Sequence, residues 1–129
     1  MENQQNSSAS LPIFNDSGKG KVIVSNIVCY ESKRRYTMLT DRYGFVHKCP
    51  LTIRKIKKTF KHCGLLQIGR GTMINLNYIS KKAKFCIERI VLIIGKAFMV
   101  GYYYKRKFKK RVKKYKLKSW RAYQQRLLV

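Results

Sequence analysis

Short apolar segments separated by turn signals are the feature that most limits how this 129-residue chain can fold. The segments are KVIVSNIVCYE (21–31), YTMLT (36–40), FVHK (45–48), LLQI (65–68), TMINLNYI (72–79) and AFMV (97–100). They are rich in β-branched and aromatic residues, which favour strands. Between two of them, DRYG ends at Gly44, in a position that tolerates a positive φ, and predicts a turn. The chain is therefore predicted to be mostly β.

The longest apolar window follows the same pattern. Residues 90–104, IVLIIGKAFMVGYYY, are fewer than the roughly 18–20 apolar residues that span a bilayer as a helix. Gly95 and Lys96 also break the window in its middle. It predicts two strands joined by a turn and not a membrane helix.

One segment departs from the strand pattern. In residues 51–64, LTIRKIKKTFKHCG, the apolar Ile53, Ile56 and Phe60 recur at helical spacing with lysines between them. Pro50 suits a helix start and Gly64 suits a helix end. The sequence predicts a short amphipathic helix whose basic face either contacts phosphates or lies in solvent.

The two ends of the chain differ from the body. Residues 1–20 are rich in Ser, Asn and Gln, and we expect a disordered leader there. Residues 21–108 are predicted to form one domain, and residues 109–129 a basic C-terminal tail. Apolar residues recur at an imperfect spacing of three to four from Phe108 onward, so the extension is either a helix or a solvated polycation.

The charge of the chain points to a polyanionic partner. It has 30 Lys and Arg against 5 Asp and Glu, for a formal net charge of +25. Residues 105–129 hold 12 basic and no acidic residues, and residues 19–104 are basic in their own right. Nucleic acid and an anionic membrane surface both reward such charge without demanding precise geometry.

Catalysis and metal binding have little support. The acidic residues of the body, Glu31, Asp41 and Glu88, each fit an ordinary structural role, and no nucleophile motif or phosphate-cradling glycine loop is present. We predict no enzyme, no catalytic residue, no cofactor and no small-molecule substrate. The pairs His47 with Cys49 and His62 with Cys63 match no paired zinc knuckle, so no metal is predicted.

The four cysteines, Cys29, Cys49, Cys63 and Cys86, lie far apart in the sequence. No C-x-x-C pair occurs among them, and the N-terminus lacks the basic and apolar regions of a signal peptide. Free thiols in a reducing cytoplasm are therefore expected.

Four parts of the body, in chain order, resemble the LytTR family of bacterial DNA-binding domains. Residues 27–31 with Tyr36 are similar to its "I-x-Y-I-E … Y" opening, and residues 51–56 fall where it has the helix "S-L-K-x-L-E". Residues 67–75 with 78–79 resemble "R-I-H-R-S-Y-L-V-N" and the following "Y-I". Residues 91–104 line up with "V-x-L-x-N-G-x-x-L-P-V-S-R-R-Y", so the resemblance covers about residues 21–108.

The resemblance implies a compact, elongated β-fold of about ten short strands with one or two short helices. In this family, inter-strand loops enter successive major grooves on one side of the duplex. Carried over by motif, the DNA-binding residues here are the hairpin tip Lys33, Arg34 and Arg35, the turn Gly69, Arg70 and Gly71, and the segment with Tyr102, Tyr103, Lys105 and Arg106.

Two of these sites depart from the family pattern. Gly69 and Gly71 replace a His and a Ser beside Arg70, which leaves the arginine more mobile. Tyr102 and Tyr103 replace two arginines, and tyrosine cannot form a bidentate contact to guanine. Arg70 could instead be a solvent-facing turn residue, and Tyr102 to Tyr104 could belong to a last strand.

The leading hypothesis is a cytoplasmic, bacterial, sequence-preferring transcriptional regulator that binds double-stranded DNA. The family's domain is usually fused to a receiver or a membrane sensor, for which these residues leave no room. Control by abundance or by a separate regulatory protein is therefore expected, with a second copy on a direct repeat as a further partner. The alternatives are a non-specific polyanion binder, for RNA or the nucleoid, and a protein held on a membrane surface by its basic tail.

Overall fold

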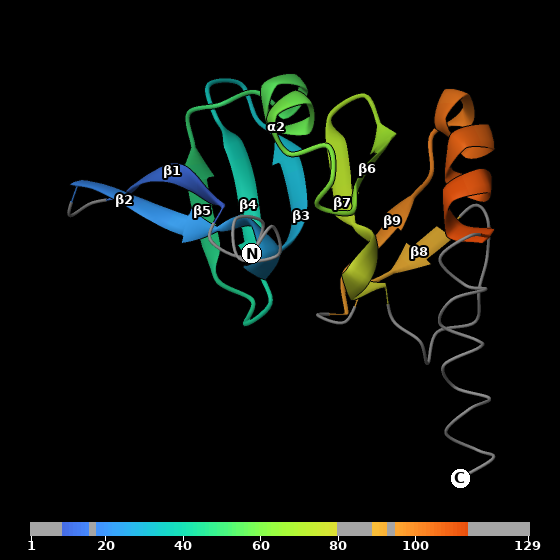
Figure 1. The fold of residues 1–129 in the computed structure, drawn as a ribbon, viewed down its shortest axis with the longest axis horizontal. Coiled ribbons are helices and arrows are strands. Elements are labelled where there is room, and N and C mark those ends of the chain that lie inside the picture. The colour runs from blue at the N-terminus through green and yellow to red at the C-terminus, as the bar shows by residue number, and fades with distance from the viewer. Residues whose placement is uncertain (1–8, 16–17, 80–88, 93–94, 114–129) are drawn as a thin grey trace, which may run out of the picture.

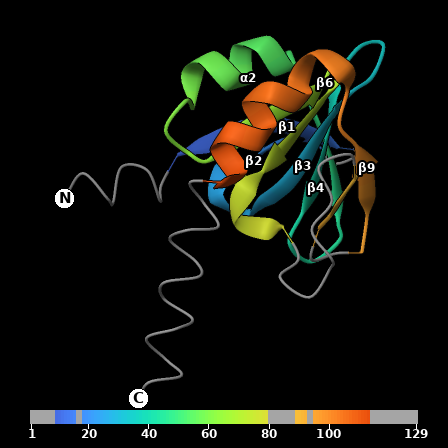
Figure 2. The same ribbon diagram turned by 90° about the vertical axis from the view of Figure 1, so that its right-hand side faces the viewer.

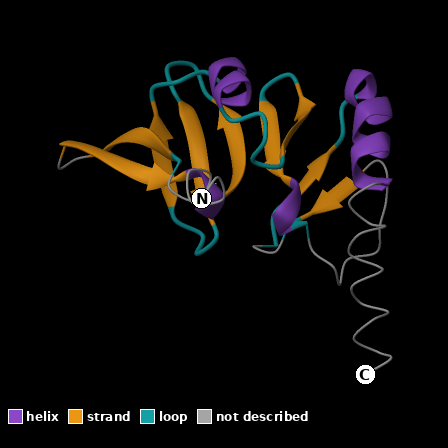
Figure 3. Ribbon diagram, in the orientation of Figure 1, coloured by secondary structure: helices purple, strands orange, loops and turns teal. Residues whose placement is uncertain are grey.

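A seven-stranded antiparallel sheet forms the centre of the molecule (Figures 1 and 3). The structure is a computed structural model and describes residues 9–15, 18–79, 89–92 and 95–113. The strands of this sheet, in spatial order, are β2 (Gly18–Ile23), β1 (Ser10–Asn15), β5 (Val46–Cys49), β4 (Thr37–Asp41), β3 (Ile27–Ser32), β7 (Thr72–Asn75) and β6 (Leu65–Gly69). A separate hairpin of β8 (Arg89–Val91) and β9 (Ala97–Met99) lies beyond β6.

The helical elements are short. The helix α2 spans Ile53–Thr59, and the side chain of Thr52 caps it by accepting a hydrogen bond from the Lys55 backbone N–H at 3.2 Å. A 3₁₀ turn at Tyr102–Tyr104 leads directly into a helical segment over residues 105–113. Both α2 and the Tyr102–Tyr104 turn contact β6. Figure 2 shows α2 and β6 from the side of the molecule, with the helical segment 105–113 in orange.

The sheet separates two hydrophobic clusters. Consecutive residues of a strand point to opposite faces, so Tyr30, paired with Met73, packs in one cluster, and Cys29, paired with Ile74, packs in the other. On the first face, α2 contributes Ile53 and Ile56. On the second face, the helical segment 105–113 contributes Phe108 and Val112, which are both buried.

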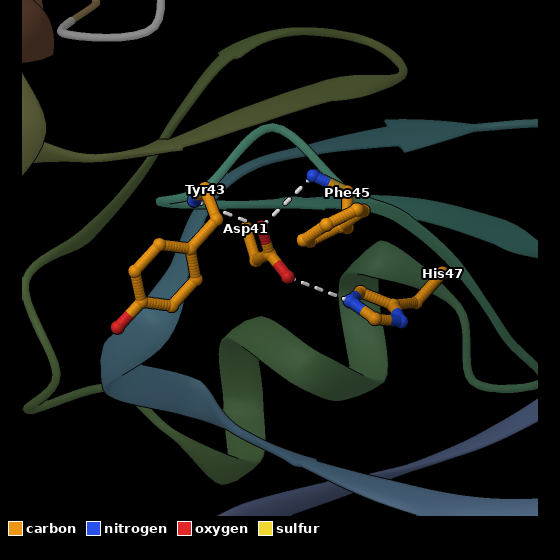
Figure 4. A network of polar contacts seen from close by, with 4 residues as sticks. All are labelled: Asp41, Tyr43, Phe45 and His47. Atoms are coloured by element: carbon orange, nitrogen blue, oxygen red, sulfur yellow. Dashed lines mark hydrogen bonds and ion pairs between the residues drawn. The ribbon is translucent and has the colours of Figure 1, made fainter.

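A buried carboxylate organises the β4–β5 turn (Figure 4). Asp41 Oδ1 accepts hydrogen bonds from the backbone N–H groups of Tyr43 and Phe45, each at 2.9 Å, and Oδ2 lies 2.9 Å from His47 Nε2. Burial raises the pKa of Asp41, but these hydrogen bonds outweigh it and hold the pKa below its ordinary value. Gly44 completes the turn with φ +89°, as its position in DRYG predicted.

The predicted fold class is confirmed, with corrections at both ends. The disordered leader was predicted to reach residue 20, but β1 and the start of β2 lie within it and pair with each other. They do so because Leu11 and Ile13 are buried in the first cluster. The helical segment 105–113 crosses the predicted domain boundary at residue 108, because Val112 belongs to the second cluster.

Smaller differences concern single elements. The internal helix ends at Thr59, five residues before Gly64, although Gly64 does adopt φ +76°. Residues 102–104 form a 3₁₀ turn and not the last strand. Of the apolar window 90–104, in which two strands and a turn were predicted, residues 93–94 lie outside the described residues. Within the described part of the chain, no helix is long and apolar enough to cross a membrane.

Candidate nucleic-acid interface

The first predicted segment is the tip of the β3–β4 hairpin. The two strands pair from Ile27 with Asp41 to Ser32 with Thr37, and the Lys33 backbone N–H donates to the Tyr36 carbonyl at 2.8 Å to close the tip. Between them, Lys33, Arg34 and Arg35 are exposed to solvent. The tip therefore presents three cations on a closed, short loop.

The second segment, the β6–β7 turn, lies beside this tip. Strands β3 and β7 are neighbours in the sheet, and the Ser32 backbone N–H donates to the Gly71 carbonyl at 2.8 Å. Arg70 is exposed. A Cβ atom at Gly71 would lie only 3.2 Å from Cβ of Ser32. Gly71 thus allows the second segment to approach the first closely.

Neither glycine beside Arg70 is required by the backbone conformation. The described glycines with positive φ are Gly18, Gly44, Gly64 and Gly95, and this group excludes Gly69 and Gly71. At Gly69 an added Cβ would meet nothing closer than Thr72 Cβ at 3.7 Å, an ordinary contact. The turn conformation alone therefore does not account for the Gly-Arg-Gly sequence.

The third segment is attached to the edge of β6. The register of β6 against β7 shifts between Gln67 and Gly69, which leaves Ile68 as a bulge on an edge strand. The Ile68 carbonyl accepts a hydrogen bond of 2.7 Å from the Gly101 backbone N–H. Residues 101–106 are thereby fixed next to the β6–β7 turn.

Two tyrosines of the third segment face solvent. Tyr102 and Tyr103 are 79% and 91% exposed, and their rings meet edge to face with centroids 5.4 Å apart. Tyr104 instead packs against the second cluster. Arg106 is exposed and Lys105 is half-buried. The aromatic and basic groups of this segment therefore lie side by side.

The three segments stand in a row at one end of the sheet, the end drawn at the top of Figure 1. Their order follows from the neighbours β4, β3, β7 and β6 and from the bond between Ile68 and Gly101. Two acidic residues lie in the described part of the chain. Glu31 forms an ion pair with Lys96, and Asp41 is held in the turn at the other end of β4. The row is therefore strongly electropositive.

Further cations flank the row on the helices. On α2, Arg54, Lys55 and Lys58 are exposed, and so are Lys109 and Lys110 on the helical segment 105–113. Lys57 is half-buried, and burial, followed by the nearby charge of Lys107, lowers its pKa. The two helical elements thus place positive charge on both sides of β6.

Sequence reasoning missed one residue of this region, Gln67. Its side-chain Nε2 donates to the carbonyl oxygens of Gly69 at 3.0 Å and Arg70 at 3.2 Å, and its Oε1 accepts from Lys57 Nζ at 3.4 Å. No signal in the sequence singles out this glutamine, because its partners include a helix residue ten positions away.

Other polar side chains support the fold elsewhere. Asn75 ties a turn through its side chain, because its Oδ1 accepts from the Asn77 backbone N–H at 3.0 Å. Tyr78 donates its hydroxyl hydrogen to the Ser25 carbonyl. The thiols of Cys29, Cys49 and Cys63 are free, and burial raises the pKa of each.

Comparison with known proteins places this geometry in a family. The family model "LytTr DNA-binding domain" matches residues 19–113. A solved LytTr DNA-binding domain, from a Bacillus cereus protein described as a putative methyl-accepting/DNA response regulator, superposes with a TM-score of 0.69 at 14% identity. The match covers 81% of this chain and 96% of that one. A search of curated proteins finds no significant match. The chain therefore belongs to the LytTR family of DNA-binding domains, which are not enzymes.

Proposed function

We propose that this chain is a sequence-preferring transcriptional regulator that reads successive major grooves of double-stranded DNA with its inter-strand loops. The observation that carries the proposal is the row of three exposed segments at one end of one sheet, connected by backbone hydrogen bonds. A row of this kind can meet only one side of a duplex. Its central segment, the Arg70 turn, then lies between the two outer ones.

The arginines and the lysine of the first two segments suit base recognition. A guanidinium can donate two hydrogen bonds to O6 and N7 of guanine, and each good bidentate contact discriminates by about 1–3 kcal/mol. Arg70 stands alone on a tight turn, whereas Lys33, Arg34 and Arg35 share one tip. Arg70 is therefore the side chain that we assign to a single base pair.

The third segment suits a different contact. Tyr102 and Tyr103 offer ring edges and single hydroxyl groups, which can pack on thymine methyl groups and form one hydrogen bond each. Lys105 and Arg106 follow within one helical turn and suit phosphate oxygens. We expect this segment to prefer A·T pairs where an arginine would have favoured guanine.

The lysines of α2 and of the helical segment 105–113 would supply affinity without specificity. Each Lys or Arg that neutralises a phosphate releases counterions and adds to the salt dependence of binding. A location in the bacterial cytoplasm, a second copy bound to a direct repeat and a separate regulatory protein form part of the same proposal.

The test uses a duplex that the full chain selects from a random-sequence pool, compared with a shuffled duplex of the same composition. Both affinities are measured over a range of salt concentrations. We expect the selected duplex to bind more than about tenfold more tightly. A smaller preference at moderate salt contradicts the proposal and supports the alternative, a non-specific polyanion binder, which the density of exposed lysines favours.

Two variants distinguish base-specific contacts from non-specific electrostatic contacts to phosphates. Arg70→Ala should lower the ratio of selected to shuffled affinity about tenfold. The triple change of Lys109, Lys110 and Lys113 to Gln should weaken both duplexes equally and reduce the salt slope by about 0.9 for each phosphate that the protein no longer neutralises. An unchanged ratio for Arg70→Ala would remove this residue from the readout.

A further inference from the structure

The side chain of Gln67 bridges α2 and the turn that carries Arg70. Its Nε2 lies 3.0 Å from the Gly69 carbonyl oxygen and 3.2 Å from the Arg70 carbonyl oxygen. Its Oε1 lies 3.4 Å from Nζ of Lys57 on α2. One amide thus contacts both peptide carbonyls at the start of the turn and a cation on the neighbouring helix.

Chemistry fixes the orientation of this amide. Peptide carbonyl oxygens can only accept hydrogen bonds, and an ammonium group can only donate them. With the amide turned over, its oxygen would face two carbonyl oxygens and its NH₂ group would face a cation. Lys57 therefore selects the orientation in which Gln67 can hold the turn.

We propose that Gln67 is a positioning residue that holds the turn, and with it the Arg70 guanidinium, in place for base recognition. The turn needs such support because glycine on either side of Arg70 gives the backbone unusual freedom. On the Gly71 side, the Ser32 N–H supplies a bond of 2.8 Å. On the Gly69 side, Gln67 supplies the matching restraint. The part of this role that concerns DNA rests on the proposed function.

The sharpest variant is Gln67→Glu. A carboxylate has nearly the same shape and can still pair with Lys57, but it cannot donate to the two carbonyls. Gln67→Met removes the hydrogen bonds without adding charge. The matched control is Ser10→Asp, which adds the same single negative charge at an exposed position. Ser10 lies at the start of β1, where it pairs with Ile23 of β2. The contact of β1 with β5 is made at the other end of the strand, at Phe14.

The first measurement needs no DNA. In the free full-length protein, ¹⁵N relaxation should show greater backbone mobility at Arg70 and Gly71 in both Gln67 variants than in the wild type and Ser10→Asp. Thermal unfolding of each variant confirms that it is folded. Unchanged mobility at these amides in both folded Gln67 variants would overturn the proposal, whatever the DNA preference of the chain.

The second measurement uses the selected and shuffled duplexes. The ratio of affinities should fall about tenfold in Gln67→Glu and in Gln67→Met, as expected when a bidentate base contact is removed, and stay unchanged in Ser10→Asp. When either Gln67 change is combined with Arg70→Ala, the ratio of affinities should be no lower than in Arg70→Ala alone. An additive loss would show that Gln67 does not act through Arg70 and would overturn the proposal. Equal affinity of the wild-type chain for the selected and shuffled duplexes would instead refute the proposed function.

Discussion

The β4–β5 turn offers a quantitative test of how one buried charge supports the fold. Asp41 is 8% exposed, and its carboxylate accepts from two backbone N–H groups, those of Tyr43 and Phe45, while it also bonds to His47. The change Asp41→Asn keeps the size and shape of the side chain. Its amide oxygen can still accept from both N–H groups, so the variant removes mainly the charge.

The expected cost follows from these two backbone bonds. Hydrogen bonds to charged groups contribute about 1.5–3 kcal/mol each, against about 0.5–1.5 kcal/mol for neutral ones. Losing the charge assistance from two bonds should therefore lower the free energy of unfolding by about 2 kcal/mol. For a domain of this size, that loss corresponds to a fall of about 8–16 °C in Tm.

The dependence on pH has a definite sign. The pKa of Asp41 is lower in the folded protein than its ordinary value, so the ionised carboxylate stabilises the fold. This contribution is complete above the unfolded pKa, about 3.9, and is lost as the pH falls through the lower folded value. The deficit of Asp41→Asn relative to the wild type should thus be full at pH 6 and should shrink as the pH falls below about 4.

Urea unfolding of both proteins at pH 6 and at several values below pH 4 measures this deficit. Glu31→Gln is a suitable comparison, because it also removes one negative charge but breaks a more exposed pair with Lys96, worth at most about 1 kcal/mol. A deficit for Asp41→Asn that is the same at every pH would refute the reasoning, since it would arise from shape and not from charge.

Two further changes test the packing around the interface. Ile56→Ala should lower the free energy of unfolding by about 2–5 kcal/mol, because Ile56 is fully buried. Lys55 is exposed, so Lys55→Ala should change this free energy by less than about 0.5 kcal/mol. Urea unfolding measures both values. Gly101→Ala should weaken binding to the selected duplex, because its Cβ would lie 3.3 Å from the Ile68 carbonyl oxygen and 3.2 Å from the Tyr104 ring. The control Gly20→Ala lies on β2, outside the row, and its Cβ would have no contact closer than 3.5 Å, so it should fold and bind normally. Equal affinity of these two glycine variants would show that residues 101–106 need not lie against β6.

Local chemistry made much of the fold predictable. Gly44 was identified as a turn residue, and the hairpin tip at residues 33–35 was located from the strand residues on either side of it. The spacing of Ile53 and Ile56 predicted α2 with its buried side. In each case the signal lies within a few residues along the chain, where turn and helix preferences act.

The features that the sequence did not predict depend on contacts between distant parts of the chain. The segment of β1, SLPIFN, follows a polar leader and contains Pro12, yet it forms a strand because Leu11 and Ile13 find a place in the first cluster. The contact of Gln67 with Lys57, and that of Ser32 with Gly71, join residues that no local pattern connects. Arg70 was identified by resemblance, but its supports became visible only in three dimensions.

The connections within the row have a consequence for how such a protein can change its target. Ser32 joins Gly71, and Gly101 joins Ile68, through main-chain atoms alone. Substitution of an exposed neighbour such as Arg34, Arg70 or Tyr103 leaves these connections intact. The distances between contact points are therefore set by the sheet, while the bases preferred at each point are set by replaceable side chains. Under the proposed function, mutation could change the preferred bases of the binding site one at a time, but the spacing between the contacted bases would stay fixed by the fold.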